Sequence, residues 1–235
     1  MEGMTTARPP RVLPPLLRPF DPALPERLFA AAHARLLRVG PAATYWRTFW
    51  YPLGSPATNV VEALIPSLQT HLPASTHRVI GVEWWIGRMH TTRVPLDFHH
   101  DRDLQLFERT GRLRHPIWSS VLFFNRVRGG SLLVTDQRLV RRGGALVLRP
   151  AEAGQFASIR PARNRFVVFP GDCFHGVLDA NDAVPSGRMP GPPGRPRLTL
   201  IVNWWDRPPA GVRSWAESRA YRALGFARRP PKRTG

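Results

Sequence analysis

The chain has 235 residues, 43% of them hydrophobic, which is enough for one sizeable domain with an apolar core. Its single cysteine, Cys173, excludes an intrachain disulfide and a zinc site built from cysteines. The net charge of +18 suggests a polyanion-binding protein. However, Lys232 is the only lysine, and an excess of arginine with 26 prolines is also typical of a GC-rich genome.

Residues 1–20 are rich in proline and are predicted to form a disordered leader. They lack the continuous apolar segment of a secretory signal, although a basic organelle-targeting peptide stays open. No apolar run approaches the roughly 20 residues that span a membrane. We therefore expect a cytoplasmic protein without a membrane partner.

The N-terminal part of the domain, residues 22–72, is predicted to be helical. Apolar side chains recur at helical spacing between Leu28 and Leu37. A second helix is expected over residues 59–72, with Thr58 as its N-cap and Pro66 as a kink or a break.

From about residue 77 to residue 206, short runs of β-branched and aromatic residues alternate with Gly and Pro turns. The expected strands are 77–88, 118–125, 131–135, 145–148, 155–159, 165–169 and 197–204. A C-terminal helix over residues 212–226 and a basic tail over residues 227–235 follow. This order predicts a single α+β domain at 21–226 that is mainly β, built around an antiparallel sandwich or barrel.

Three polar side chains form a candidate metal site. In an extended chain, residues i and i+2 point to the same side, so His99 and Asp101 are expected to project together. His175 follows a predicted strand, in a turn, and is the leading candidate for a third ligand. Two histidines and one carboxylate on one face of a metal are typical of non-haem Fe(II) oxygenases. Taken alone, a His-x-Asp pair and a distant histidine also occur in surface loops and as structural residues.

Arg197 begins a strongly β-forming strand, RLTLIVNWW, which we expect to be buried. A buried guanidinium requires an anionic or polar partner, and its planar fork suits a carboxylate. Thr199 would face the same way and add a hydroxyl. A dicarboxylate that chelates the metal at one end would use both residues at the other, although pairing of Arg197 with an internal Asp or Glu stays an alternative.

These residues, in this order and rough spacing, resemble the 2-oxoglutarate/Fe(II)-dependent dioxygenase superfamily, and its prolyl-hydroxylase-like branch in particular. The resemblance runs from about residue 82 to residue 204. It includes the segments SVLFFNRVRGGSLL (120–133) and RPARNRFVVFPGDCFHGV (160–177).

The resemblance implies a double-stranded β-helix, or jelly roll, that holds Fe(II) and uses O2 and 2-oxoglutarate, with ascorbate as an added reductant. It implies metal ligation by His99, Asp101 and His175. Arg197 and Thr199 would bind the distal carboxylate of 2-oxoglutarate. Leu132 would pack on the co-substrate, and Phe123 stands where related hydroxylases often have a tyrosine that hydrogen-bonds it. The implied activity is a hydroxylation that converts 2-oxoglutarate to succinate and CO2.

The sequence leaves the substrate and the oligomeric state open. A peptidyl or small-molecule substrate is favoured. A nucleic-acid oxygenase is the first alternative, but the second arginine expected in alkylated-base demethylases is absent from residues 198–205. The second alternative is a non-catalytic jelly-roll binding module, which would bind no iron.

Overall fold

The computed structural model describes residues 15–39, 47–74, 78–190, 192, 194–218 and 220–226. The predicted basic tail at 227–235, residues 1–14 of the predicted leader, and residue 77, where the first core strand is expected to begin, lie outside the described residues. None of the helices in the described part has the length and hydrophobicity that a membrane crossing needs.

Six strands form one antiparallel sheet in the order β1-β8-β4-β10-β3-β2. Their bounds are Arg18–Phe20 (β1), Phe49–Pro52 (β2), Gly81–Met89 (β3), Trp118–Phe123 (β4), Arg165–Pro170 (β8) and Arg197–Trp205 (β10). β10 pairs with β3 along its whole length and with β4 from Thr199 to Trp204. All of its residues are buried, so its register is fixed from both sides.

The second sheet is built on the long strand β5, which pairs with β6, β7 and β9. The bounds are Leu132–Arg142 (β5), Ala145–Arg149 (β6), Phe156–Ile159 (β7) and Cys173–Val177 (β9). Apolar side chains from both sheets form one cluster between them, which includes Val121, Phe123, Leu132, Val134, Val167, Phe169, Cys173 and Ile201. The predicted α+β, mainly β fold with a jelly-roll core of antiparallel strands is confirmed.

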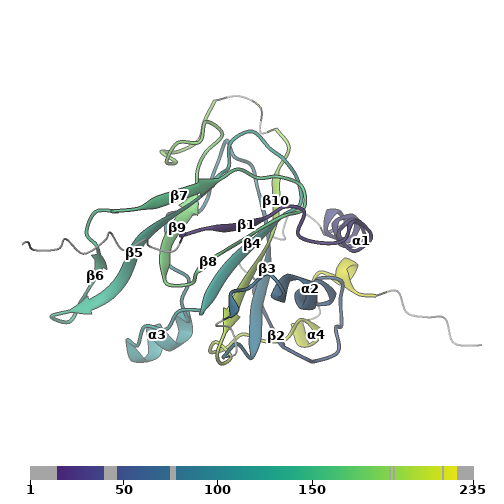
Figure 1. Cartoon of the computed structure of the whole chain (residues 1–235), viewed down its shortest axis with the longest axis horizontal. Helices are drawn as coiled ribbons and strands as arrows, with labels where there is room; N and C mark the ends of the chain where they lie inside the picture. The colour runs from purple at the N-terminus through teal and green to yellow at the C-terminus, as the bar shows by residue number, and fades with distance from the viewer. Residues whose placement is uncertain are drawn as a thin grey trace, which may run out of the picture.

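Helices α1, α2 and α4 lie together on the outer face of the six-stranded sheet, whereas α3 lies apart from them (Figure 1). Their bounds are Glu26–Leu37 (α1), Glu62–Leu64 (η1), Ile65–Gln69 (α2), Leu104–Thr110 (α3), Trp215–Ser218 (α4) and Arg222–Leu224 (η3). Phe29 and Leu36 of α1 pack in the larger apolar cluster with Trp84 and Leu122 of the sheet. The apolar side chains that recur at helical spacing therefore form the face by which α1 packs on the sheet.

The N-terminal region differs from the sequence-based expectation in three places. Residues 18–20 of the predicted leader form β1 and pair with β8, and β2 lies inside the region expected to be helical. The second helix is shorter than 59–72, since η1 and α2 end at Gln69. The side chain of Asn59, not that of Thr58, accepts hydrogen bonds from the first backbone N–H groups, at 2.9 and 3.0 Å.

Two further segments depart from expectation. The C-terminal helix expected at 212–226 is present only as the short turns α4 and η3, and Tyr221 between them has a left-handed backbone (φ 52°) that no helix continues through. The charged stretch 102–117, for which the sequence analysis predicts no helix or strand, contains α3. Asp103 caps it by accepting from the Leu106 N–H at 3.0 Å, and Gly111 ends it with φ 66°.

Candidate metal centre

The backbones of His99 and His175 hydrogen-bond to each other, although the two residues lie far apart in the sequence. The His99 N–H donates to the His175 carbonyl at 2.8 Å, and the His175 N–H donates to the His99 carbonyl at 2.9 Å. Such an antiparallel pair places both side chains on the same side, and the two ring centres are 4.6 Å apart. His175 thus lies in strand β9 and not in the turn that the sequence predicts.

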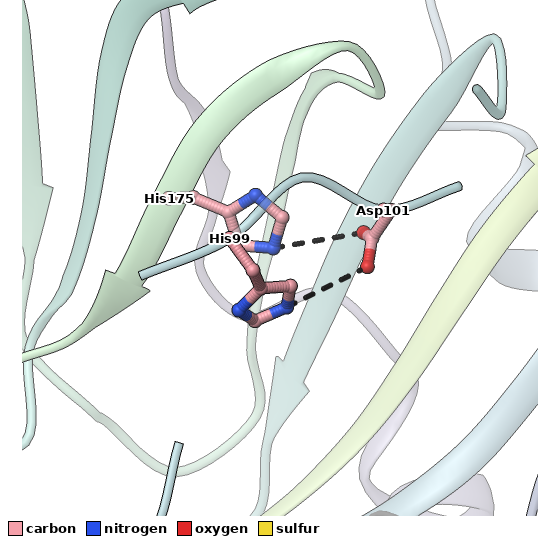
Figure 2. A group of neighbouring side chains, drawn as sticks. All are labelled: His99, Asp101 and His175. Atoms are coloured by element: carbon pink, nitrogen blue, oxygen red, sulfur yellow. Dashed lines mark ion pairs between the residues drawn. The ribbon is translucent and has the colours of Figure 1, made fainter. Parts of the chain in front are cut away.

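Asp101 lies two residues after His99, and its carboxylate faces both imidazole rings (Figure 2). Oδ1 is 3.8 Å from Nε2 of His99, and Oδ2 is 3.6 Å from Nε2 of His175. The Ser119 hydroxyl, on β4, donates to Oδ2 at 2.7 Å. The carboxylate is therefore oriented by the six-stranded sheet, while His175 belongs to the other sheet.

Hydrogen bonds on the far side of each ring select the tautomer that a metal needs. Nδ1 of His99 lies 2.9 Å from the Asp97 carbonyl, and Nδ1 of His175 lies 3.0 Å from the Cys173 carbonyl. A carbonyl only accepts, so the proton is on Nδ1 and the Nε2 lone pairs point toward Asp101. Burial lowers the pKa of His175, which favours the neutral ring that binds metal.

The donor set fits a divalent metal ion. The ligand atoms of His99, Asp101 and His175 all lie within 4.8 Å of one another. Their nitrogen–oxygen separations are too long for hydrogen bonds, but two bonds of about 2.1 Å to a shared ion would span them. Two imidazoles and one carboxylate on one side leave coordination positions open on the other, which is the ligand pattern of non-haem Fe(II) sites.

Arg197 and the three candidate ligands line the same cavity between the sheets, whose walls are otherwise apolar. Its lining includes Trp85, Leu96, Val121, Leu132, Phe169, Val177 and Ile201. Only 2% of Arg197 is exposed, and its Nε donates to the Gly130 carbonyl at 3.0 Å. Gly130 has φ 72°, and a Cβ there would lie 3.3 Å from Cδ of Arg197, so a glycine makes this approach possible.

The other residues predicted to bind the co-substrate lie beside Arg197. Leu132 lines the cavity. Phe123 and Thr199 are fully buried and are not among the lining residues. The ring centre of Phe123 is 4.9 Å from the guanidinium of Arg197, and the Thr199 hydroxyl lies 3.4 Å from the Gly87 carbonyl. Phe123 therefore supports the guanidinium with its ring face.

Two polar residues that follow His99 in the sequence, His100 and Arg114, each have a structural partner. His100 points away from the three ligands, with Nε2 3.4 Å from the Gln137 carbonyl, and burial lowers its pKa to about 4. Arg114 pairs with Asp103 at 3.5 Å and lies over the Trp205 ring.

Sequence reasoning missed a second cleft that opens beside the metal centre. Asp101 and Trp85 line both the cavity and this cleft, and Glu83 and Asn203 lie in the cleft's wall. Burial, followed by the nearby Asp101 and Asp103 carboxylates, raises the pKa of Glu83 to about 7, although the Thr48 side chain opposes this rise. The only signal in the sequence is one acidic residue, Glu83, within a strand of mostly apolar residues.

No protein-family model matches the sequence, and a comparison with curated proteins returns no match. Solved structures do resemble the fold. A prolyl-4-hydroxylase from Pseudomonas putida is 19% identical, with a TM-score of 0.45, over 82% of this chain and 94% of that one. A prolyl hydroxylase from Trichoplax adhaerens, in complex with a hypoxia inducible factor peptide, is 10% identical, with a TM-score of 0.40, over 81% and 84%.

A third similar structure is HygX from Streptomyces hygroscopicus, with nickel, 2-oxoglutarate and hygromycin B bound. It is 14% identical, with a TM-score of 0.44, over 85% of each chain. At these identities, the residues of the site itself must carry the functional assignment.

Proposed function

We propose that the chain is an Fe(II)- and 2-oxoglutarate-dependent oxygenase that hydroxylates a peptidyl or small-molecule substrate. One observation carries the proposal. His99, Asp101 and His175 bring three metal-binding atoms within 4.8 Å, and a buried arginine lines the same cavity. A metal and a guanidinium in one apolar cavity are what a chelating dicarboxylate requires at its two ends.

In this proposal each residue has a separate role. His99, Asp101 and His175 hold the metal, and Arg197 binds the distal carboxylate of 2-oxoglutarate. Thr199 adds its hydroxyl to the binding of the same carboxylate, Phe123 supports the Arg197 guanidinium with its ring face, and Leu132 packs against the co-substrate. When bound, Fe(II) with 2-oxoglutarate and O2 supplies the oxidising chemistry, which yields hydroxylated product, succinate and CO2.

The cavity walls contribute by excluding water. Val121, Phe169, Val177 and Ile201 offer no hydrogen-bonding side chain, so bulk solvent gains little by entering. The carboxylate of Asp101 is only 8% exposed and is held by Ser119. Holding the ligands in place in this way keeps their geometry fixed before a metal or a co-substrate arrives.

The proposal is tested by measuring succinate formed from 2-oxoglutarate in the presence of Fe(II), O2 and ascorbate. Uncoupled turnover of 2-oxoglutarate can occur without the substrate, so the substrate does not have to be known. We expect turnover by the wild type and its loss in His175→Ala, together with a fall in Fe(II) affinity of more than about 100-fold. His100→Ala is the matched control, because the neighbouring imidazole points away from the ligands. Equal turnover in wild type and His175→Ala would contradict the proposal, and a wild type that binds no Fe(II) would favour the binding module.

A second variant separates the co-substrate from the metal. Arg197→Gln removes the charge but keeps a hydrogen-bonding side chain. We expect the KM for 2-oxoglutarate to rise about tenfold or more, because a charge-assisted bidentate contact is lost, while Fe(II) affinity stays near that of the wild type. A changed Fe(II) affinity with an unchanged KM would assign Arg197 a structural role instead.

A further inference from the structure

The cleft beside the metal centre is formed by parts of the chain that are distant in sequence. Glu83 and Trp85 come from β3, Asn203 from β10, and residues 209–213 close it from the far side. Asp101 and Trp85 line both this cleft and the cavity that holds Arg197. A molecule bound in the cleft would therefore reach the metal centre on the side away from Arg197.

Glu83 and Asn203 form the polar floor of the cleft. They are direct partners in the register of β3 and β10, so their side chains lie next to each other on one face of the sheet. Asn203 is only 2% exposed, yet its Oδ1 atom has no hydrogen-bond partner within the part of the chain that the structure describes. A buried acceptor without a partner costs free energy unless a ligand supplies a donor.

The charges around this floor are unusual for the protein. The chain has only 16 acidic residues, and Glu83, Asp101 and Asp103 all line this one cleft. Asp103 has its own partners, because it pairs with Arg114 and accepts from the Ala210 N–H at 3.0 Å. Among the described residues, no arginine forms an ion pair with Glu83, although Arg47, Arg102 and Arg213 also line the cleft.

We propose that this cleft binds the substrate, and that Glu83 and Asn203 together recognise a cationic nitrogen group, an ammonium or a guanidinium, near the carbon that is oxidised. The Glu83 carboxylate and the unpartnered Oδ1 atom of Asn203 both accept hydrogen bonds, so together they suit a ligand group that donates them. A cation would also offset the repulsion between the neighbouring carboxylates, and the Trp85 ring gives it a π face. The oxidation step rests on the proposed function, but the recognition of the cation does not.

Binding of small probes tests the recognition directly. The probes are n-butylamine, which is protonated at neutral pH, and its neutral and anionic analogues n-butanol and butyrate. The full chain is used as purified, with no iron added, and the NMR signal of the Trp85 indole N–H, identified with Trp85→Phe, reports binding. We expect n-butylamine to shift this signal saturably and to bind at least about tenfold more tightly than n-butanol, because a charge-assisted hydrogen bond is worth about that factor.

Two variants and one control locate the effect. Glu83→Gln keeps the shape of the side chain and is expected to lower n-butylamine affinity about tenfold. Asn203→Leu removes the amide and is expected to lower it as well. Glu152→Gln makes the same change at an exposed position outside the cleft, and we expect wild-type affinity. If thermal unfolding shows that Glu83→Gln is not folded, Asn203→Leu decides the question.

The inference is overturned if a folded Glu83→Gln, or Asn203→Leu where that variant decides, binds n-butylamine as the wild type does. It is overturned equally if n-butanol or butyrate binds as tightly as the amine. Failure of the proposed function has a different signature, since loss of Fe(II)-dependent succinate formation leaves amine binding unchanged. Turnover without selective amine binding would keep the oxygenase and reject the cationic substrate.

Discussion

The two sheets of the domain differ in how they are buried. β10, in the six-stranded sheet, is buried along its whole length, whereas β6 and β7 of the other sheet have no fully buried residue. Helices and a large apolar cluster cover the outer face of the first sheet. The metal centre joins the two, because Ser119 on β4 orients Asp101, and His175 comes from β9. We therefore infer that the six-stranded sheet supplies most of the stability, and that the second sheet completes the site.

The same Leu→Ala truncation in each of the two sheets should give the largest expected difference in the free energy of unfolding. Leu200 on β10 is fully buried, and Leu139 on β5 is half-buried. Leu200→Ala should lower the free energy of unfolding by about 3 kcal/mol, and Leu139→Ala by about 1 kcal/mol, because the first leaves a cavity and the second an exposed gap. Chemical denaturation of both variants measures this. Equal losses would reject the unequal division of stability.

Two adjacent serines on β4 test whether the six-stranded sheet positions a metal ligand. The Ser119 hydroxyl donates to Asp101, whereas the Ser120 hydroxyl donates to the Val202 carbonyl at 2.7 Å on the opposite face. Ser119→Ala should weaken Fe(II) binding about 10- to 100-fold, since it removes the group that orients a ligand. Ser120→Ala should affect unfolding but not Fe(II) affinity. The same change of Fe(II) affinity in both variants would contradict this role of Ser119.

Glu83 makes the free energy of unfolding depend on pH. Its pKa rises from an ordinary value of 4.5 to about 7 in the folded chain, so the folded state keeps a proton that the unfolded chain has lost between these values. Its contribution therefore becomes more destabilising as pH rises from about 4.5 to about 7. In iron-free protein, Glu83→Gln should be more stable than the wild type at pH 8, by on the order of 1–2 kcal/mol. The difference should vanish at pH 4, and a gain that is independent of pH would contradict this cause.

The smallest effect is expected in the connection between the sheets. The chain between β9 and β10 is long and contains the exposed residues Ser186 and Gly187. Six Gly and Ser residues inserted between these two should lower stability by less than about 0.5 kcal/mol, because closure entropy grows slowly with loop length. Fe(II) affinity and the KM for 2-oxoglutarate should stay at wild-type values. A large loss of either would show that this connection positions the site.

Elements with a clear apolar pattern or flanking turn residues, including the short strands β6 and β7, were predictable from the sequence, whereas β1, β2 and β9 were not. α1, β4, β8 and β10 follow apolar patterns that are long enough to indicate both type and burial. β1 has three residues and includes Pro19, and it exists because β8 offers it an edge. β9 contains Gly176 and closely follows Gly171, so it resembles a turn locally, but pairing with β5 makes it a strand.

The same distinction applies to the site. His99 and Asp101 could be predicted to meet because the i, i+2 rule is local. His175 can reach them only if the strands between residues 101 and 175 fold back toward His99. In the structure the three side chains do come together. Glu83 and Asn203 could not be paired from the sequence, because only the register of β3 against β10 makes them neighbours. The metal and co-substrate roles of the cavity residues, and the substrate role of Glu83 and Asn203, are the proposals that the experiments above test.

The placement of the ligands on both sheets has a consequence for the lifetime of the protein in a cell. An ion held by His99, Asp101 and His175 would bind only the folded chain and would tie the less buried sheet to the more buried one. Its free energy of binding would then add to the barrier that a protease must overcome to reach the chain. Cells short of iron would degrade this protein faster than cells with an ample supply, so its abundance would follow iron status without any dedicated regulator.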